Sequence, residues 1–195
     1  MVDFNNNQLT YVREPAKRVF AAELREATET MRDTSDEKSP TYVILPTGER
    51  CNRILLCGAV MQRDKTGEQN VIYRARISDP TGVFYVSAGQ YQPEAMAQLA
   101  QIDASNPCIA MVVGKPNVFE SQDGKKLVSV RAESVQIVDS DTRSMWVLDA
   151  AKLTMDRIDA LEKGEVPDVQ IARGKYNLPP EHWRTMVRDV LAKLV

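Results

Sequence analysis

The stretch from Val71 to Tyr91, VIYRARISDPTGVFYVSAGQY, constrains the fold more than any other part of the chain. Its centre, DPTG at 79–82, has the residue preferences of a type I turn: aspartate bonds back to the chain, proline presets φ, and glycine closes the turn. On both sides of the turn, apolar and polar residues alternate with a period of two, the pattern of a half-buried strand. The stretch therefore predicts a β-hairpin with one apolar face and one exposed face.

The exposed face of this hairpin carries Arg74, Arg76 and Tyr85. Cations meet phosphates and aromatic rings stack on bases, so this combination suits single-stranded nucleic acid. It is equally compatible with an ordinary solvated face. The chain has a net charge of −2, and residues 41–139 hold ten Lys/Arg and ten Asp/Glu. Binding to a polyanion would therefore need a local basic patch or a basic partner subunit.

The residues around the hairpin predict a small barrel. Short apolar strands are expected at 42–45 and 53–62, two more in the hairpin, and two at 107–113 and 127–138, with a short helix at 93–103. Counted from the strand at 53–62, the helix lies between the third and fourth of five strands, which is the order of the OB-fold, a closed Greek-key barrel that the helix plugs at one end. We predict a mainly β chain with this five-stranded barrel at 41–139 and flanking N-terminal and C-terminal helices.

In an OB-fold the second and third strands face the ligand, and the loops between strands one and two and between strands four and five flank it. Here those loops would begin at residues 63 and 115, and both are basic. A hairpin tip with two lysines can also be no more than a soluble loop. The DNA-binding residues expected from this geometry are Arg74, Arg76 and Tyr85 on the sheet, and Arg63, Lys65, Lys115, Phe119, Lys125 and Lys126 in the loops.

The N-terminal part, 1–40, is expected to hold a helix over residues 14–32, with loose residues before it and a charged linker at 33–40. Alanine, glutamate and arginine support the helix interior, and Pro15 fits its first turn. Such a helix would be an appendage of the barrel. It must bury its apolar stripe on the barrel or on another chain.

A second helix is predicted at 140–164, with Asp141 and Thr142 as cap candidates and Gly164 as its stop. Its apolar residues cover more than one side, so it can pack on the barrel or join helices of other subunits. The second use makes it an assembly helix. Its partner-binding residues would be Trp146, Leu148, Ala151, Met155, Ile158 and Leu161. A connector and a final amphipathic helix are expected in 165–195.

Signs of an enzyme are missing from the sequence. It has no phosphate-binding loop, dinucleotide fingerprint or nucleophile elbow. Three cysteines and one histidine have no zinc-like spacing, so neither a metal nor another cofactor is assigned. Free thiols fit a reducing cytosol, and no apolar run approaches the roughly 20 residues that span a bilayer. We therefore expect a cytoplasmic protein that binds a ligand or serves as a scaffold for other proteins.

Four segments resemble the archaeal replication protein A-associated proteins, a family related to the smaller subunits of replication protein A. They are REPAKRVFAAEL (13–24), LPTGERCNRI (45–54), RARISDPTGVFYVSAGQYQPEA (74–95) and VVGKPNVFE (112–120). The resemblance implies an OB-fold subunit that works with a replication protein A large subunit on single-stranded DNA in replication, repair and recombination. In related complexes each subunit gives the helix after its barrel to a shared bundle, which would make 140–164 the assembly helix.

Two functions therefore remain open. The chain is either an accessory subunit that binds single-stranded DNA or supports its binding, or a protein-interaction scaffold whose barrel touches little or no DNA. The balanced charge of the barrel and the surplus apolar faces of the helices favour the scaffold. A barrel that binds tRNA or oligosaccharide is allowed by the fold, although the resemblance disfavours it.

Overall fold

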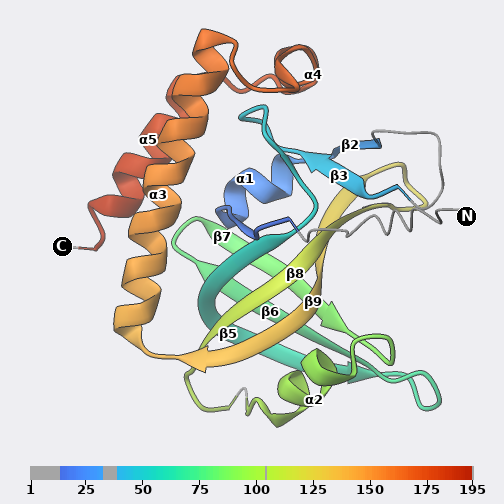
Figure 1. Cartoon of the computed structure of the whole chain (residues 1–195). Helices are drawn as coiled ribbons and strands as arrows, with labels where there is room; N and C mark the ends of the chain where they lie inside the picture. Colours follow the sequence, from blue (N-terminus) through green and yellow to red (C-terminus); the bar gives the residue numbers. More distant parts are fainter. Residues whose placement is uncertain (1–13, 33–38, 104, 195) are drawn as a thin grey trace, which may run out of the picture.

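The chain forms a closed five-stranded β-barrel of OB-fold connectivity, seen in a computed structural model that describes residues 14–32, 39–103 and 105–194 (Figure 1). The strands pair in the order β5-β6-β7-β9-β8, and β8 closes the barrel on β5. Only β7 and β9 pair in parallel within it. The barrel strands are β5 (Ile54–Thr66), β6 (Ile72–Asp79), β7 (Gly82–Ala88), β8 (Ile109–Glu120) and β9 (Lys126–Val138).

The expected hairpin is confirmed as β6 and β7. Ala75 pairs with Val86 and Ile77 with Phe84, and all four side chains are buried. Their neighbours along each strand point outwards, because successive side chains of a strand lie on opposite faces. The predicted period-two pattern is therefore confirmed: one face of the hairpin lies in the barrel core, and the other face points outwards.

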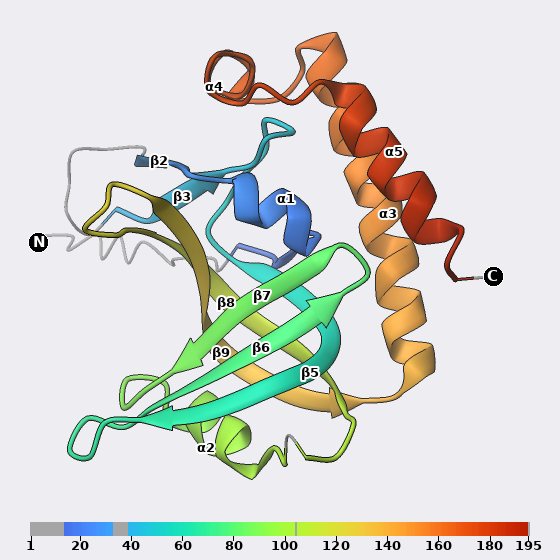
Figure 2. The same ribbon diagram turned by 180° about the vertical axis from the view of Figure 1, so that it is seen from behind.

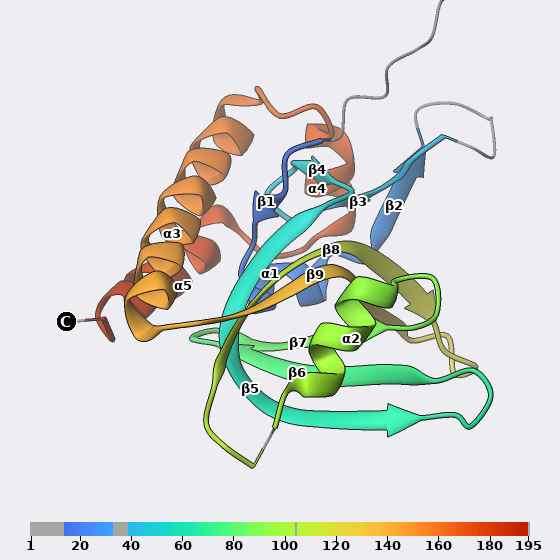
Figure 3. The same cartoon turned by 60° about the horizontal axis from the view of Figure 1, so that its bottom comes forward.

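One end of the barrel is closed by α2 (Pro93–Gln101), the helix expected between the third and fourth strands (Figure 3). Ala95 and Leu99 of this helix are buried in the barrel core. β5 and β6 approach each other closely at Gly58, where a Cβ atom would collide with the carbonyl oxygen of Ser78 on β6. Glycine in a strand interior often marks such a close backbone approach.

The helix predicted over residues 14–32 is wrong. Only α1 (Ala21–Glu26) is helical, between the short strands β1 (Lys17–Arg18) and β2 (Glu29–Arg32). β1 lies outside the barrel as a sixth strand, parallel to β5. β2 pairs with β3 (Thr41–Ile44), which pairs with β4 (Arg50–Cys51) in a separate three-stranded sheet. Pairing with distant strands outweighs the weak helix propensity of this segment.

The turn of the hairpin, which lies close to α1 in the view from behind the barrel (Figure 2), caps that helix. Phe20 stands at the N-cap position and offers no side-chain acceptor. Instead, the amide of Ala21 donates to Asp79 Oδ2 at 2.8 Å, and the amide of Ala22 donates to Thr81 Oγ1 at 3.0 Å. Burial raises the pKa of the Asp79 carboxyl, although its hydrogen bonds act in the opposite direction. The turn therefore both joins two strands and satisfies the free amides of a helix start.

The long C-terminal helix α3 (Ser140–Lys163) ends at Gly164, as predicted, in a left-handed conformation with φ of 77°. Its N-cap is Asp139, which accepts from the amide of Thr142 at 2.8 Å, and not Asp141 or Thr142 themselves. The final helix is α5 (Pro180–Leu191), which lies beside α3 (Figures 1 and 2). The predicted connector contains a further short helix, α4 (Val169–Lys175).

A buried ion pair holds α3 against the N-terminal segment. Arg157 Nη2 donates to Glu23 Oε2 at 2.6 Å, and the Thr47 hydroxyl donates to Glu23 Oε1 at 2.6 Å. Arg157 also donates to Thr154 Oγ1 at 2.9 Å. Burial alone would lower the pKa of Arg157, but the charge and hydrogen bond of Glu23 raise it above its ordinary value. The pair is therefore charged and hydrogen-bonded, as a buried ion pair must be.

Candidate nucleic-acid interface

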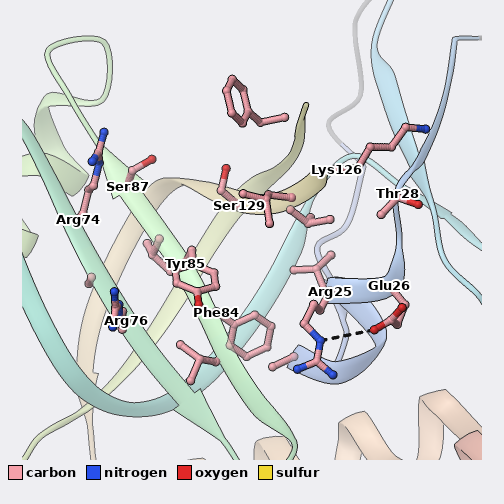
Figure 4. Close-up of a pocket in the computed structure, with 18 of the residues that line it drawn as sticks. Arg25, Glu26, Thr28, Arg74, Arg76, Phe84, Tyr85, Ser87, Lys126 and Ser129 are labelled. Carbon is pink, nitrogen blue, oxygen red and sulfur yellow. Dashed lines mark ion pairs between the residues drawn. The ribbon is translucent and has the colours of Figure 1, made fainter. Parts of the chain in front are cut away.

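A groove of about 950 Å³ runs along the outer face of the barrel (Figure 4). Its floor is the exposed face of β6 and β7. One wall is α1, and the other is formed by the far ends of β8 and β9. The charged and aromatic lining residues are Arg25, Glu26, Asp64, Arg74, Arg76, Phe84, Tyr85, Phe119, Lys125 and Lys126.

The floor carries the three side chains expected on the sheet. Arg74 and Arg76 lie on β6, and Tyr85 lies opposite Arg76 on β7. The guanidinium of Arg76 sits over the Tyr85 ring, 5.9 Å from its centroid. This contact leaves 52% of the tyrosine exposed. The floor thus combines a cation and a ring that is free on its outer side to stack on a base.

The second wall is an arm of two strands, because β8 and β9 continue beyond the barrel. Pairing between β5 and β8 stops at Gly114, whereas β8 and β9 stay paired to Glu120 and Lys126. We call residues 115–131 the β8–β9 arm. A loop was predicted here, so Lys115, Phe119 and Lys126 lie in strands and not in a loop. A long β-arm holds its side chains in a fixed alternation, which a mobile loop would not.

Phe119 and Lys125 lie near the end of this arm and both line the groove. Phe119 is 58% exposed and pairs in register with Leu127. Lys126 also lines the groove, and its ammonium group donates to Glu29 Oε1 of β2 at 2.9 Å. The arm therefore brings one exposed ring and two cations towards the floor.

Arg63 and Lys65 do not line the groove. They belong to β5, and a register shift between Val60 and Gln62 moves both to the opposite face from Arg74 and Arg76. Such a bulge adds one residue to a strand and so exchanges its two faces. Arg63 donates twice to the carbonyl of Ile102, at 2.8 and 3.1 Å, and lies over the Tyr73 ring. It stabilises the end of the barrel.

Lys115 lies outside the groove lining but on the same outer face as its floor. It pairs with Arg131, which pairs with Ser87, which pairs with Arg74. Residues paired in this way share one face of a sheet. Arg131 is an exposed cation that sequence reasoning missed, although its place between Val130 and Ala132 in an alternating strand is a usable signal.

Charge in the groove is positive, in contrast to the whole chain. The lining holds five Lys or Arg side chains and two carboxylates, Glu26 and Asp64, which leaves a net charge of +3. Arg25 and Glu26 are ion-paired at 3.5 Å on the α1 wall. Arg25 was not predicted as a site residue, because its segment was interpreted as part of a long helix appended to the barrel and not as a wall of its groove.

The predicted partner-binding residues of α3 do not share one surface. Trp146, Ala151, Ile158 and Leu161 are buried within the chain, and the Trp146 indole donates to the carbonyl of Leu55 at 3.0 Å. Met155 is half-buried, and only Leu148 is largely exposed. In this fold α3 therefore packs mainly on its own chain.

Residues 14–32, 39–103 and 105–194 form neither a cluster of metal ligands nor a membrane-spanning helix. In that part of the chain no three His, Cys, Asp or Glu side chains gather where they could hold a metal ion. No helix formed by these residues is both long and apolar enough to cross a membrane.

Comparison with known proteins yields similarity of fold alone. No protein-family model matches the chain, and no curated protein sequence matches it. Among solved structures, yeast Stn1 and Ten1 are similar at 11% identity and a TM-score of 0.41, over 71% of this chain and 63% of that chain. The mitochondrial single-stranded DNA binding protein Rim1 of S. cerevisiae is similar at 16% identity and a TM-score of 0.34, over 45% and 94%. The asparaginyl-tRNA synthetase of Pyrococcus horikoshii is similar at 10% identity and a TM-score of 0.39, over 75% and 32%. Scores this low identify no ligand, and the chain is assigned by its own topology to the OB-fold proteins.

Proposed function

We propose that this chain is a non-enzymatic accessory subunit of a replication protein A-type complex and that its groove binds single-stranded DNA. The observation that carries this proposal is the gathering of five cations and two exposed rings in one groove of an OB-fold barrel. The resemblance to archaeal replication protein A-associated proteins supports the particular complex, with roles in replication, repair and recombination.

In this proposal the cations and the aromatic rings of the groove have different tasks. Arg74 and Arg76 contact phosphates, while Tyr85 on the floor and Phe119 on the arm stack on bases. Stacking is worth about 1–3 kcal/mol per base and tolerates any sequence. The two carboxylates of the lining lower the affinity for a polyanion, so the isolated chain would bind DNA weakly and best at low salt, and its partner would add to the affinity.

The partner is a replication protein A large subunit that associates through α3. Intramolecular packing buries most of the predicted stripe, so the contact would use the exposed side chains Met145 and Leu148, which are 69% and 54% exposed. These two residues lie one helical turn apart and share a face of α3. The same exposed pair favours the second candidate function, a scaffold that binds a protein and little DNA.

The deciding experiment is fluorescence anisotropy of labelled oligo-dT with the purified full chain at low and moderate salt. We expect binding that weakens with salt, because each phosphate contact contributes a slope of about 0.7 for single strands. The double variant Arg74→Glu/Arg76→Glu should weaken binding at least about tenfold and lower the slope by roughly one to two. The matched control is Lys65→Glu/Lys152→Glu, which reverses two exposed cations outside the groove.

Equal loss of binding in both double variants would show that general charge, and not the groove, is responsible. Absence of binding at low salt would contradict a DNA-binding barrel and leave the scaffold. In that case the large subunit should still be retained by the chain, and Met145→Glu/Leu148→Glu should release it.

A further inference from the structure

The two strands that border the groove separate after a very short pairing. β7 and β9 are paired only at Val86 with Val130 and at Ser87 with Arg131. Beyond these pairs, residues 83–85 of β7 have β6 on one side, and residues 127–129 of β9 have β8 on one side. For these described residues no strand is paired on the side that faces the groove. Two backbone edges therefore open into the same groove (Figure 4).

Unpaired strand edges are templates for another strand, because their N–H and C=O groups repeat at the spacing of an extended peptide. Natural proteins usually cover such edges or protect them with charge. Here α1 covers part of the opening with Ala21 and Leu24, yet a groove of about 950 Å³ remains between α1, β7 and the β8–β9 arm. The edges are thus within reach of a ligand.

The side chains beside these edges are largely apolar. Val83 of β7 and Leu127 and Val128 of β9 line the groove, together with Leu24 of α1. Leu127 is 48% exposed and pairs in register with Phe119, which is 58% exposed, so two large apolar side chains are exposed side by side on the arm. When a peptide adds a strand to a sheet, main-chain hydrogen bonds give affinity and pockets for alternate side chains give specificity.

The charge of the groove selects the kind of peptide. Its net charge of +3 favours a segment with acidic side chains between its apolar ones. A nucleic acid would satisfy the cations but has no row of N–H and C=O groups for the strand edges. The backbone edges therefore favour a polypeptide at this end of the groove.

We propose that an extended, acidic segment of a partner protein adds as a strand between the edges of β7 and β9. Its acidic side chains lie on the outer face with the groove cations, and its alternate apolar side chains, which point to the opposite face of the sheet, contact Val128. Because this strand and single-stranded DNA would use the same cations, each excludes the other. The peptide site does not depend on DNA binding, and either property can be present alone.

The test uses the full chain and a fluorescein-labelled peptide of alternating glutamate and valine. Two control peptides separate the contributions. In the first control peptide, lysine replaces glutamate. In the second, alternate backbone amides are N-methylated, so these amides cannot donate hydrogen bonds and the peptide cannot pair as a strand. We expect saturable binding of the acidic peptide, at least tenfold weaker binding of both controls, and slowed amide exchange in residues 83–85 and 127–129. Oligo-dT should displace the peptide if DNA also binds.

A matched pair of variants locates the site. Leu127→Glu puts a negative charge into the groove and should weaken peptide binding at least tenfold. Ile137→Glu changes a 56% exposed residue of the same strand that does not line the groove, and should have no effect. Equal binding of the N-methylated peptide, or equal effects of the two variants, would overturn the strand-addition site. Failure of oligo-dT to bind while the peptide binds would count only against the DNA-binding proposal.

Discussion

Breaking the buried pair of Glu23 and Arg157 should be the most damaging polar change in the described part of the chain. The side chain of Glu23 is fully buried and that of Arg157 is 7% exposed. Arg157→Met would leave a carboxylate in the interior with only the Thr47 hydroxyl as its partner. Removing one member of a buried ion pair costs about 3–5 kcal/mol. Total stabilities are about 5–15 kcal/mol, so this single change would remove a large part of the folding free energy.

The double variant Glu23→Leu/Arg157→Met separates the cost of an orphaned charge from the worth of the pair. Hydrophobic replacement of a whole buried pair is often neutral or stabilising. We therefore expect the double variant to be clearly more stable than Arg157→Met, with a remaining loss of about 1–3 kcal/mol because the buried Thr47 and Thr154 hydroxyls lose hydrogen-bond partners. A matched control is Arg184→Met, because Arg184 of α5 also bonds to two carboxylates, Asp159 at 2.9 Å and Glu162 at 2.7 Å, but at the surface. Exposed pairs of this kind are worth about 0–1 kcal/mol.

Urea unfolding followed by tryptophan fluorescence measures these effects, since Trp146 and Trp183 are both buried. The midpoint should fall strongly for Arg157→Met and little for Arg184→Met, with similar slopes in all variants. A loss below about 1 kcal/mol for Arg157→Met would refute the reasoning that burial makes the orphaned charge costly. So would a double variant as unstable as the sum of both single changes.

Three further outcomes follow from the geometry. Asp79→Ala removes the acceptor for the first amide of α1, so it should lower the free energy of unfolding by about 2 kcal/mol and speed amide exchange in that helix. Asp79→Asn keeps an acceptor and should lower the free energy of unfolding less. Equal losses in the two variants would contradict the cap. Burial raises the pKa of Cys51 to about 12 and of Cys57 to about 11, so a thiol reagent at neutral pH should modify the native chain at Cys108 and spare the other two, as mass spectrometry can show. Burial also raises the pKa of Tyr176 to about 12 from a model-peptide value of 10.0; the unfolded chain therefore ionises first, and the urea midpoint should fall as pH rises through this interval, less so for Tyr176→Phe.

The barrel could be predicted because its signals are local. The β6–β7 hairpin is encoded by alternation and by a turn of four residues, and α2 is opened by Pro93. The same alternation placed Arg74, Arg76 and Tyr85 on the outer face, where the structure has them. Such features depend on residues that are close together in the sequence, so one amino-acid sequence is enough to predict them.

The errors arose where the partner lies far away in the chain. Residues 14–32 have a helix-forming composition, but part of this segment forms strands instead, because β1 pairs with β5 and β2 pairs with β3. Arg63 and Lys65 changed face because of one extra residue in β5, which no composition reveals. The β8–β9 arm looked like a loop because Pro116, Asn117 and Gly124 are turn-forming residues, yet the first two pair in register with β9. Arg25 was missed as a groove residue because the short helix α1 and the strands on either side of it were interpreted as one long helix.

The capping of α1 by the hairpin turn has a consequence for synthesis on the ribosome. Its first amide bonds to a residue 58 positions later, and its Glu23 bonds to Arg157, 134 positions later. Helix α1 leaves the ribosome long before Arg157 and therefore cannot settle until that residue has followed. Contacts of such long sequence separation slow folding, since the loop entropy is lost before they form. The apolar residues of this segment stay exposed during that time, so the N-terminal segment is where we expect a nascent chain to engage chaperones.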